Sequence, residues 1–240
     1  MNYEEVAANL RAVYREICPR YRLDDETEVT TENHRHYCQI LREITTSFSH
    51  PLSVLDVGCG TGRYFHCLEN VDLLVGLDIS PDMLKAAESP VRHWEIGVRE
   101  TRLICANVYL ASFPAASFDF IYSLGMFGHG CPVTAEICEN FHQWLKPNGR
   151  LFFNVVDLAT LPLLLRVRRF LRQLLEPILP SGLRRSLAER RQRLPFFGMT
   201  RPELKAILET TSFTRFVVDT HICSSPLWRG VLLECLAAKE

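Results

Sequence analysis

Three glycines at alternate positions follow an apolar stretch and could hold a ligand against the main chain: Gly58, Gly60 and Gly62. Glycine adopts positive φ angles readily and lets a ligand approach the backbone closely. Asp78 lies twenty residues after the first glycine, at the end of the next apolar stretch. A carboxylate at this spacing accepts hydrogen bonds from a ribose diol, whereas Ser80 is the better cap for the helix that follows. These residues predict a site for a ribose-containing ligand.

The glycine spacing narrows the choice of ligand. A dinucleotide site needs its third glycine where this chain has Arg63. Asp56 precedes Gly58 by two residues, and no pyrophosphate-binding pattern is present. The stretch VLDVGCGTG at residues 54–62 instead resembles the first motif of the class I S-adenosylmethionine-dependent methyltransferases. The resemblance continues in order through residues 76–84, 113–123 and 145–151, and it covers about residues 53–157.

The resemblance implies a role for each residue around this motif. Asp56 and the backbone of the first two glycines would hold the methionine part of S-adenosylmethionine, and Asp78 would bind both ribose hydroxyls. Asn107 stands where the family often has an aspartate beside the adenine, and its amide oxygen can accept the same hydrogen bond. The cofactor residues implied in this way are Asp56, Gly58, Cys59, Gly60, Gly62, Asp78, Ile79, Met83, Asn107, Val108, Ser123 and Leu124.

His129 is the candidate general base of the chain. It follows the fourth predicted strand, where the substrate side of the family opens, and an imidazole there could deprotonate a hydroxyl or amine acceptor. The alternative is a loop histidine without a catalytic part. Methyl transfer from a sulfonium mainly requires alignment of the reactants and exclusion of water, so a base is optional.

The histidines and cysteines predict no metal site. His34 and His36 stand two residues apart on a predicted helix, so they point to different faces and are expected to be exposed. The nine cysteines include no C-x-x-C pair, and we expect reduced thiols without structural zinc. Cys59 is expected to be a small residue that fills space in the glycine turn, and Cys131 has no stronger claim to be a nucleophile.

Alternating strands and helices must position these residues. Short apolar runs predict strands at residues 53–57, 73–77, 102–106, 118–123, 150–156, 214–221 and 228–236. Helical spacing and caps predict helices at residues 81–87, 133–145 and 200–210. Repeated strand–helix units require right-handed crossovers and therefore a parallel sheet. We expect an α/β fold: a doubly wound, Rossmann-like, mostly parallel seven-stranded sheet with an antiparallel last strand.

The chain is expected to be a single methyltransferase domain, residues 1–240, with four parts. An N-terminal helical cap at residues 1–50 contains an acidic loop at residues 24–28, and a cofactor-binding core follows at residues 51–157. A helical lid insert at residues 158–197 comes after the fifth strand. Residues 198–240 supply a C-terminal helix and two strands.

Charge is unevenly distributed along an ordinary globular composition. The formal net charge is −1 and 47% of the residues are hydrophobic, which excludes a disordered chain and a whole-chain polyelectrolyte. From Arg166 to Arg193, nine arginines and two glutamates give +7, which leaves −8 on the rest. Leucines at helical spacing oppose these arginines. The pattern is typical of a lid over an apolar substrate, of an element lying on a membrane surface, or of a cap helix with solvated arginines.

The expected function is transfer of a methyl group from S-adenosylmethionine to a small, apolar or amphiphilic acceptor at oxygen, nitrogen or carbon, by in-line displacement. One alternative is an RNA or protein methyltransferase that docks through the arginine-rich insert. Another is a non-catalytic module that binds S-adenosylmethionine. Nucleic acid is the less favoured partner, because no aromatic-rich basic groove is visible. No transmembrane segment or secretion signal is predicted, so we expect a cytoplasmic protein with possible lipid contact through residues 158–197.

Overall fold

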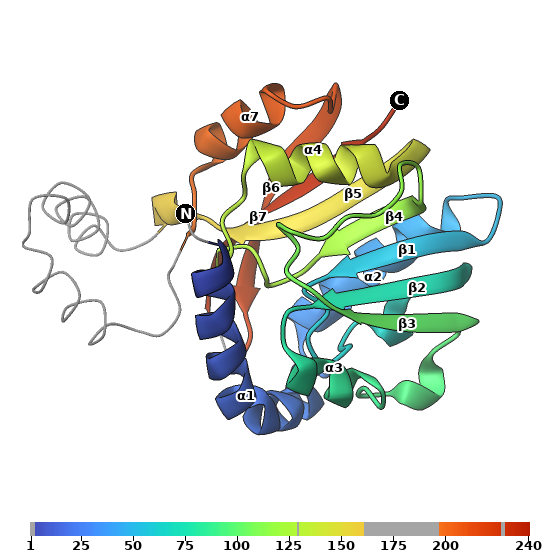
Figure 1. The fold of residues 1–240 in the computed structure, drawn as a ribbon, viewed down its shortest axis with the longest axis vertical. Helices are drawn as coiled ribbons and strands as arrows, with labels where there is room; N and C mark the ends of the chain where they lie inside the picture. Colours follow the sequence, from blue (N-terminus) through green and yellow to red (C-terminus); the bar gives the residue numbers. More distant parts are fainter. Residues whose placement is uncertain (1–2, 129, 161–196, 227–228) are drawn as a thin grey trace, which may run out of the picture.

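The computed structural model describes residues 3–128, 130–160, 197–226 and 229–240. A seven-stranded sheet in the order β3-β2-β1-β4-β5-β7-β6 carries helices on both faces (Figure 1). Neighbouring strands from β1 to β5 pair in parallel, and β7 is antiparallel to both β5 and β6. The predicted doubly wound sheet with an antiparallel last strand is confirmed. Its strands are β1 Leu52–Val57, β2 Val71–Asp78, β3 Glu100–Cys105, β4 Phe118–Ser123, β5 Leu145–Val156, β6 Arg215–Ser224 and β7 Arg229–Ala238.

The hydrophobic core has two layers, one on each face of the sheet. The described α-helices are α1 Tyr3–Glu28, α2 Glu32–Thr46, α3 Pro81–Ala87, α4 Ala135–Trp144 and α7 Arg201–Glu209. Three short 3₁₀ helices accompany them: η1 Phe65–Cys67, η2 His93–Glu95 and η3 Leu158–Thr160. Apolar side chains of α4 and α7 form one core, and those of α2, α3 and η1 form the other. The two layers bury the apolar strands from both sides, as a parallel sheet requires.

Two predicted caps begin helices where the sequence places them. The Ser80 hydroxyl accepts a hydrogen bond from the Met83 backbone N–H at the start of α3. At α7, the Thr200 side chain accepts from the Glu203 N–H while the Glu203 carboxylate accepts from the Thr200 N–H. This reciprocal pair is the capping box expected from the residue spacing. The first cap fixes the chain directly after Asp78.

Two local predictions are wrong. The expected acidic loop at residues 24–28 is the last part of α1, and Asp25 and Glu28 in it are buried. The chain continues as a helix there because Asp25 has buried partners in the glycine turn, described below. Strand β5 begins at Leu145 rather than at Arg150, because Leu145 already pairs with Phe118 of β4, and an irregular stretch separates this pair from the run of pairs that starts at Arg150.

Part of the predicted lid insert and the start of the last predicted strand lie outside the described residues: residues 161–196 and 227–228. Among the helices that the structure describes, none is long and apolar enough to cross a membrane.

Candidate active site

The glycine turn after β1 has the backbone geometry that its sequence predicts. The φ angles of Gly58, Gly60 and Gly62 are all positive, at +74°, +55° and +77°. A Cβ atom on Gly58 would lie 2.8 Å from the side chain of Met126, so no larger residue fits there. A Cβ atom on Gly60 would meet nothing within 4 Å. The turn is therefore packed against the protein at its first glycine and open at its second.

Asp78 ties the end of β2 to this turn. Its Oδ2 atom accepts a hydrogen bond from the Gly60 N–H at 2.9 Å, and its Oδ1 atom accepts from the Ser80 N–H at 2.8 Å. Each carboxylate oxygen can accept a second hydrogen bond, so both remain available to a ligand. Burial raises the pKa of this carboxyl, and the backbone donors oppose that shift. The carboxylate thus both orders the turn and faces the space beside it.

Asp56 is a buried acid with no cationic neighbour among the residues that the structure describes. Its residue is 3% exposed, and burial raises its pKa to about 8. The Tyr122 hydroxyl opposes the shift, whereas Asp78, an anion, adds to it. A buried carboxylate is costly unless a charge partner or hydrogen-bond donors compensate it. The site therefore favours a ligand that brings a cation to Asp56.

One pocket brings together ten of the twelve predicted cofactor residues. Its lining includes Asp56, Gly58, Cys59, Gly60, Asp78, Ile79, Met83, Asn107, Val108 and Leu124. They come from the ends of β1 and β2 and the turns that follow them, from the start of α3 and from the loops after β3 and β4, at the edge of the sheet where parallel α/β folds bind ligands. The other two, Gly62 and Ser123, do not line the pocket. The Ser123 hydroxyl is buried and donates to the Val57 carbonyl at 2.8 Å, which joins β4 to β1.

Helix α1 forms a wall of this pocket, although none of its residues is among the predicted site residues. Val6, Ala7, Leu10, Tyr14 and Tyr21 line it. Their recurrence along one face of a predicted helix was visible in the sequence, but that pattern is equally typical of a helix packed on any core. The chain contains no motif that indicates which surface this helix covers.

A buried polar cluster fixes α1 to the glycine turn. The carboxylate of Asp25, in the last turns of α1, accepts hydrogen bonds from the Thr61 hydroxyl and the Arg63 guanidinium. The Asp25 side chain is fully buried and that of Arg63 is 20% exposed. The guanidinium also lies over the Tyr21 ring, 5.8 Å from its centroid. Arg63, which stands where a dinucleotide-binding motif has its third glycine, thus anchors α1, a wall of the pocket, to the glycine turn.

The loop after β4 forms another part of the pocket wall and packs against both α1 and the glycine turn. Met126, Gly130, Cys131 and Pro132 line it, and Gly130 packs against Leu10 so closely that a Cβ atom would lie 2.6 Å from that side chain. Burial raises the pKa of Cys131 to about 12, so its thiol is protonated at neutral pH. His129, the candidate base, lies outside the described residues. The loop on either side of it is described.

The histidine and cysteine predictions are partly wrong. His34 and His36 do point to different sides of α2, as predicted, but His34 is buried and His36 is half-buried. His36 bonds to Glu234 at 2.9 Å and stacks on His221. Cys38 and Cys67 form a disulfide, contrary to the expected reduced thiols. Packing of α2 on η1 joins these two cysteines, and no spacing along the chain could indicate that pairing.

Comparison with known proteins identifies the central part of the chain. A family profile described as a methyltransferase domain matches residues 54–149. A ubiquinone biosynthesis O-methyltransferase of Coxiella burnetii is 27% identical over 119 residues, which are 49% of this chain and 48% of the relative. A malonyl-[acyl-carrier protein] O-methyltransferase of Methylovorus is 32% identical over 117 residues, 46% of this chain and 39% of the relative. The chain therefore spans about half, or less, of these relatives.

A solved structure resembles the whole chain. It is a 1,6-didemethyltoxoflavin-N1-methyltransferase of Burkholderia thailandensis with bound 1,6-didemethyltoxoflavin and S-adenosylhomocysteine. The two superpose with a TM-score of 0.64 and 21% sequence identity, over 100% of this chain and 91% of that one. At this identity the likeness establishes a shared fold.

Proposed function

Since residues 54–149 belong to the class I S-adenosylmethionine-dependent methyltransferase family, we propose that this chain transfers a methyl group from S-adenosylmethionine to a small, apolar or amphiphilic acceptor. One observation carries the proposal. The glycine turn, Asp56 and Asp78 face one pocket, whose other wall is the apolar side of α1. The pocket therefore offers polar groups for a charged, ribose-containing cofactor beside an apolar surface for an acceptor.

The residues present fit the cofactor. Asp56 would pair with the ammonium of its methionine part, which supplies the positive charge that this buried acid lacks. Asp78 would accept hydrogen bonds from the ribose hydroxyls through the capacity that its two backbone contacts leave open. Ile79 and Met83 would pack on the adenine, with Asn107 and Val108 at its edge. When bound, S-adenosylmethionine supplies an electrophilic methyl group on a sulfonium.

The chain would contribute alignment and a dry environment to the reaction. Val6, Ala7 and Leu10 place apolar surface opposite the glycine turn, which favours an acceptor with apolar parts and excludes water. Leu124 and Met126 extend that surface from the loop after β4. In-line displacement gains most from such positioning of the acceptor atom. Oxygen, nitrogen and carbon acceptors all remain compatible with this surface.

We propose His129 as the general base for an acceptor that must lose a proton. Its neighbour in the sequence, Gly130, lines the pocket. His129→Gln is expected to lower turnover while S-adenosylhomocysteine binding stays unchanged. His142→Gln, at the end of α4 and away from the pocket, is the control. Equal turnover in the two variants would remove His129 from the mechanism.

Calorimetric titration with S-adenosylmethionine tests the proposed function. The wild-type chain should bind it, and Asp78→Ala should lose about 1.5–3 kcal/mol of binding free energy, or roughly 10- to 150-fold in affinity, as the loss of hydrogen bonds to a charged group predicts. Asp72→Ala is the matched control, because Asp72 lies on the same strand and is exposed. No binding to the wild type would refute the proposal.

A second assay separates an enzyme from a binding module. S-adenosylhomocysteine release is measured over a panel of hydroxyl, amine and activated-carbon acceptors that carry apolar groups. Release that depends on one class of acceptor would support catalysis and identify the methylated atom. Tight cofactor binding with no release on any acceptor would favour the non-catalytic alternative.

We further propose that the four predicted parts of residues 1–240 act as one unit. The buried contacts of Asp25 with Thr61 and Arg63 support this for the N-terminal cap, because they join α1 to the cofactor-binding core. The cytoplasmic location predicted from the sequence stays a prediction.

A further inference from the structure

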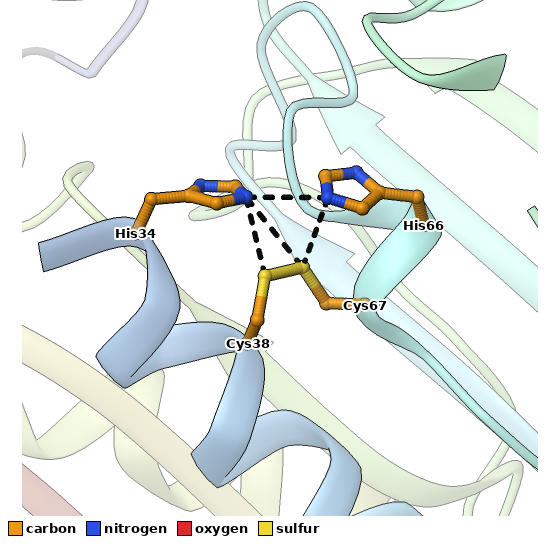
Figure 2. Close-up of side chains that lie close together, drawn as sticks. All are labelled: His34, Cys38, His66 and Cys67. Carbon is orange, nitrogen blue, oxygen red and sulfur yellow. Dashed lines mark hydrogen bonds between the residues drawn. A yellow bond between two sulfur atoms is a disulfide. The ribbon is translucent and has the colours of Figure 1, made fainter. Parts of the chain in front are cut away.

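Four metal-binding side chains converge between α2 and η1, and none of them lines the pocket of the proposed site. They are His34, Cys38, His66 and Cys67, and all four are buried (Figure 2). One ligand atom from each residue lies within 4.8 Å of every other. The proposed methyl transfer uses none of them.

We propose that these four residues form a zinc site when the two cysteines are reduced. The proposal goes beyond the proposed function and replaces our prediction that the chain has no metal site. Two thiolates and two imidazoles are a common ligand set of tetrahedral structural zinc. Because all four positions are filled by protein, the ion would hold α2 against η1 rather than bind substrate.

Four of the six distances between the ligand atoms are close to those of a tetrahedron, and the two sulfurs, which are bonded in the disulfide, would have to separate. Zinc bonds of about 2.0–2.3 Å to nitrogen and sulfur place neighbouring ligand atoms roughly 3.3–3.8 Å apart. The Nε2 atoms of His34 and His66 are 3.2 Å apart. Cys67 Sγ lies 3.5 Å from the His66 Nε2 and 3.8 Å from the His34 Nε2. Cys38 Sγ lies 3.2 Å from the His34 Nε2.

Local structure brings the ligands together in pairs. His34 and Cys38 are one helical turn apart on α2, so both side chains leave the same face of the helix. His66 and Cys67 are consecutive in η1, which begins three residues after Gly62. Figure 2 shows the two imidazoles pointing toward each other above the two sulfurs. The arrangement presents four donor atoms to a single point.

The four ligands are buried, and zinc binds imidazole in its neutral form. The Nδ1 atoms of both imidazoles are buried without a hydrogen-bond partner among the described residues. An ion bound to the two Nε2 atoms, which face each other 3.2 Å apart, would leave the Nδ1 atom of each ring to carry the ring proton. A surface pocket lined by His34, Cys38 and His66 gives the ion a path from solvent.

The disulfide and the zinc site exclude each other. A thiol or phosphine reductant transfers two electrons to the Cys38–Cys67 disulfide, and two protons complete the two thiols. Zinc then displaces those two protons and binds two thiolates. A two-electron oxidant, such as a low-molecular-weight disulfide that is reduced to two thiols, takes the electrons back, re-forms the Cys38–Cys67 bond and releases the ion. The site is therefore available only under reducing conditions.

Zinc stoichiometry tests the proposal on the full chain. The protein is reduced with a phosphine, incubated with Zn²⁺ and desalted, and bound zinc is measured per chain. We expect one ion in the wild type. Cys38→Ser and His34→Asn should bind it more than about tenfold more weakly, since even residues that only orient a metal ligand contribute 10- to 100-fold. His93→Asn, at an exposed histidine of η2, and Cys105→Ser, at an exposed cysteine, should bind as the wild type does.

Cobalt substitution gives a readout that needs no variant. Co²⁺ in the reduced wild type should show thiolate charge-transfer absorption and the visible bands of a tetrahedral site, and both should vanish on oxidation. Four results would overturn the proposal: a reduced wild type that retains no zinc, equal retention in His34→Asn, loss of retention in the two controls, or cysteines 38 and 67 that resist alkylation after reduction. Because neither metal assay involves S-adenosylmethionine, a failure here leaves the calorimetric test of the proposed function intact.

Discussion

Asp56→Asn is expected to stabilise the ligand-free protein while weakening its affinity for S-adenosylmethionine. The native pKa of about 8 lies above the unfolded value near 3.8. Between these values the native state binds the additional proton, so the contribution of Asp56 to stability falls as pH rises from about 4 to about 8. Asparagine has nearly the same shape and carries no charge. The stability of the Asp56→Asn variant therefore does not fall in this way as the pH rises.

The magnitude follows from the size of the shift. One pH unit within this window corresponds to about 1.36 kcal/mol, so the stability gap between variant and wild type should widen by at most about 4 kcal/mol from pH 5 to pH 8. At roughly 2–4 °C per kcal/mol for a chain of this length, the gap in melting temperature should grow by up to about 8–16 °C. Above pH 8 the gap should stay constant.

Cofactor affinity should change in the opposite direction. Loss of a charge-assisted contact to the ammonium costs about 1.5–3 kcal/mol, or roughly 10- to 150-fold in affinity. Thermal melts of both proteins from pH 5 to pH 9, followed by calorimetric titration at pH 8, measure the two effects. A melting-temperature gap that does not depend on pH would show that Asp56 titrates normally. An unchanged affinity would remove the carboxylate from the cofactor site.

Two further predictions concern the elements around the site. Asp25→Ala should lower the free energy of unfolding by about 3–5 kcal/mol in chemical denaturation and weaken cofactor binding, because it leaves the largely buried Arg63 unpaired. The control, Glu26→Ala, removes an exposed neighbour and should change the free energy of unfolding by less than about 0.5 kcal/mol. Equal effects of the two substitutions would mean that the Asp25–Arg63 pair does not anchor α1. If the arginines of residues 166–193 contact lipid, the protein should sediment with anionic vesicles at low salt and be released at high salt, and equal recovery with neutral vesicles would contradict contact driven by charge.

The parts of this protein that could be predicted from sequence depend on local rules. The cap at Ser80 and the capping box at Thr200 each involve residues three positions apart, and both occur as expected. The ends of β1 and β2 are marked by apolar runs followed by Gly58 and Asp78. Because parallel strands end at one edge of a sheet, these local signals also placed their side chains in one pocket.

The errors arose where distant segments meet. The sequence predicts that Asp25 belongs to an acidic loop, since acidic residues are common in loops. In the structure it is buried against Thr61 and Arg63, which lie more than thirty-five positions away. Cys38 and Cys67 are 29 residues apart in the chain. Sequence spacing relates His34 to His36, whereas the structure pairs it with His66 on η1, 32 positions away. None of these contacts follows from spacing, because the packing of α1 and α2 against the core decides them.

The segment after the glycine turn explains why those contacts are concentrated there. Between Gly62 and the start of β2 the chain forms only the three-residue helix η1, which supplies few backbone hydrogen bonds to order it. Side chains supply the order instead: Thr61 and Arg63 bond to Asp25 on α1, and the next turn is joined to α2 through Cys67. Both sets of contacts hold the backbone that leaves the cofactor turn. Breaking either one should therefore loosen the same pocket from opposite sides, and their effects on cofactor affinity should exceed the sum of the two single losses, because each set restrains the segment that the other has released.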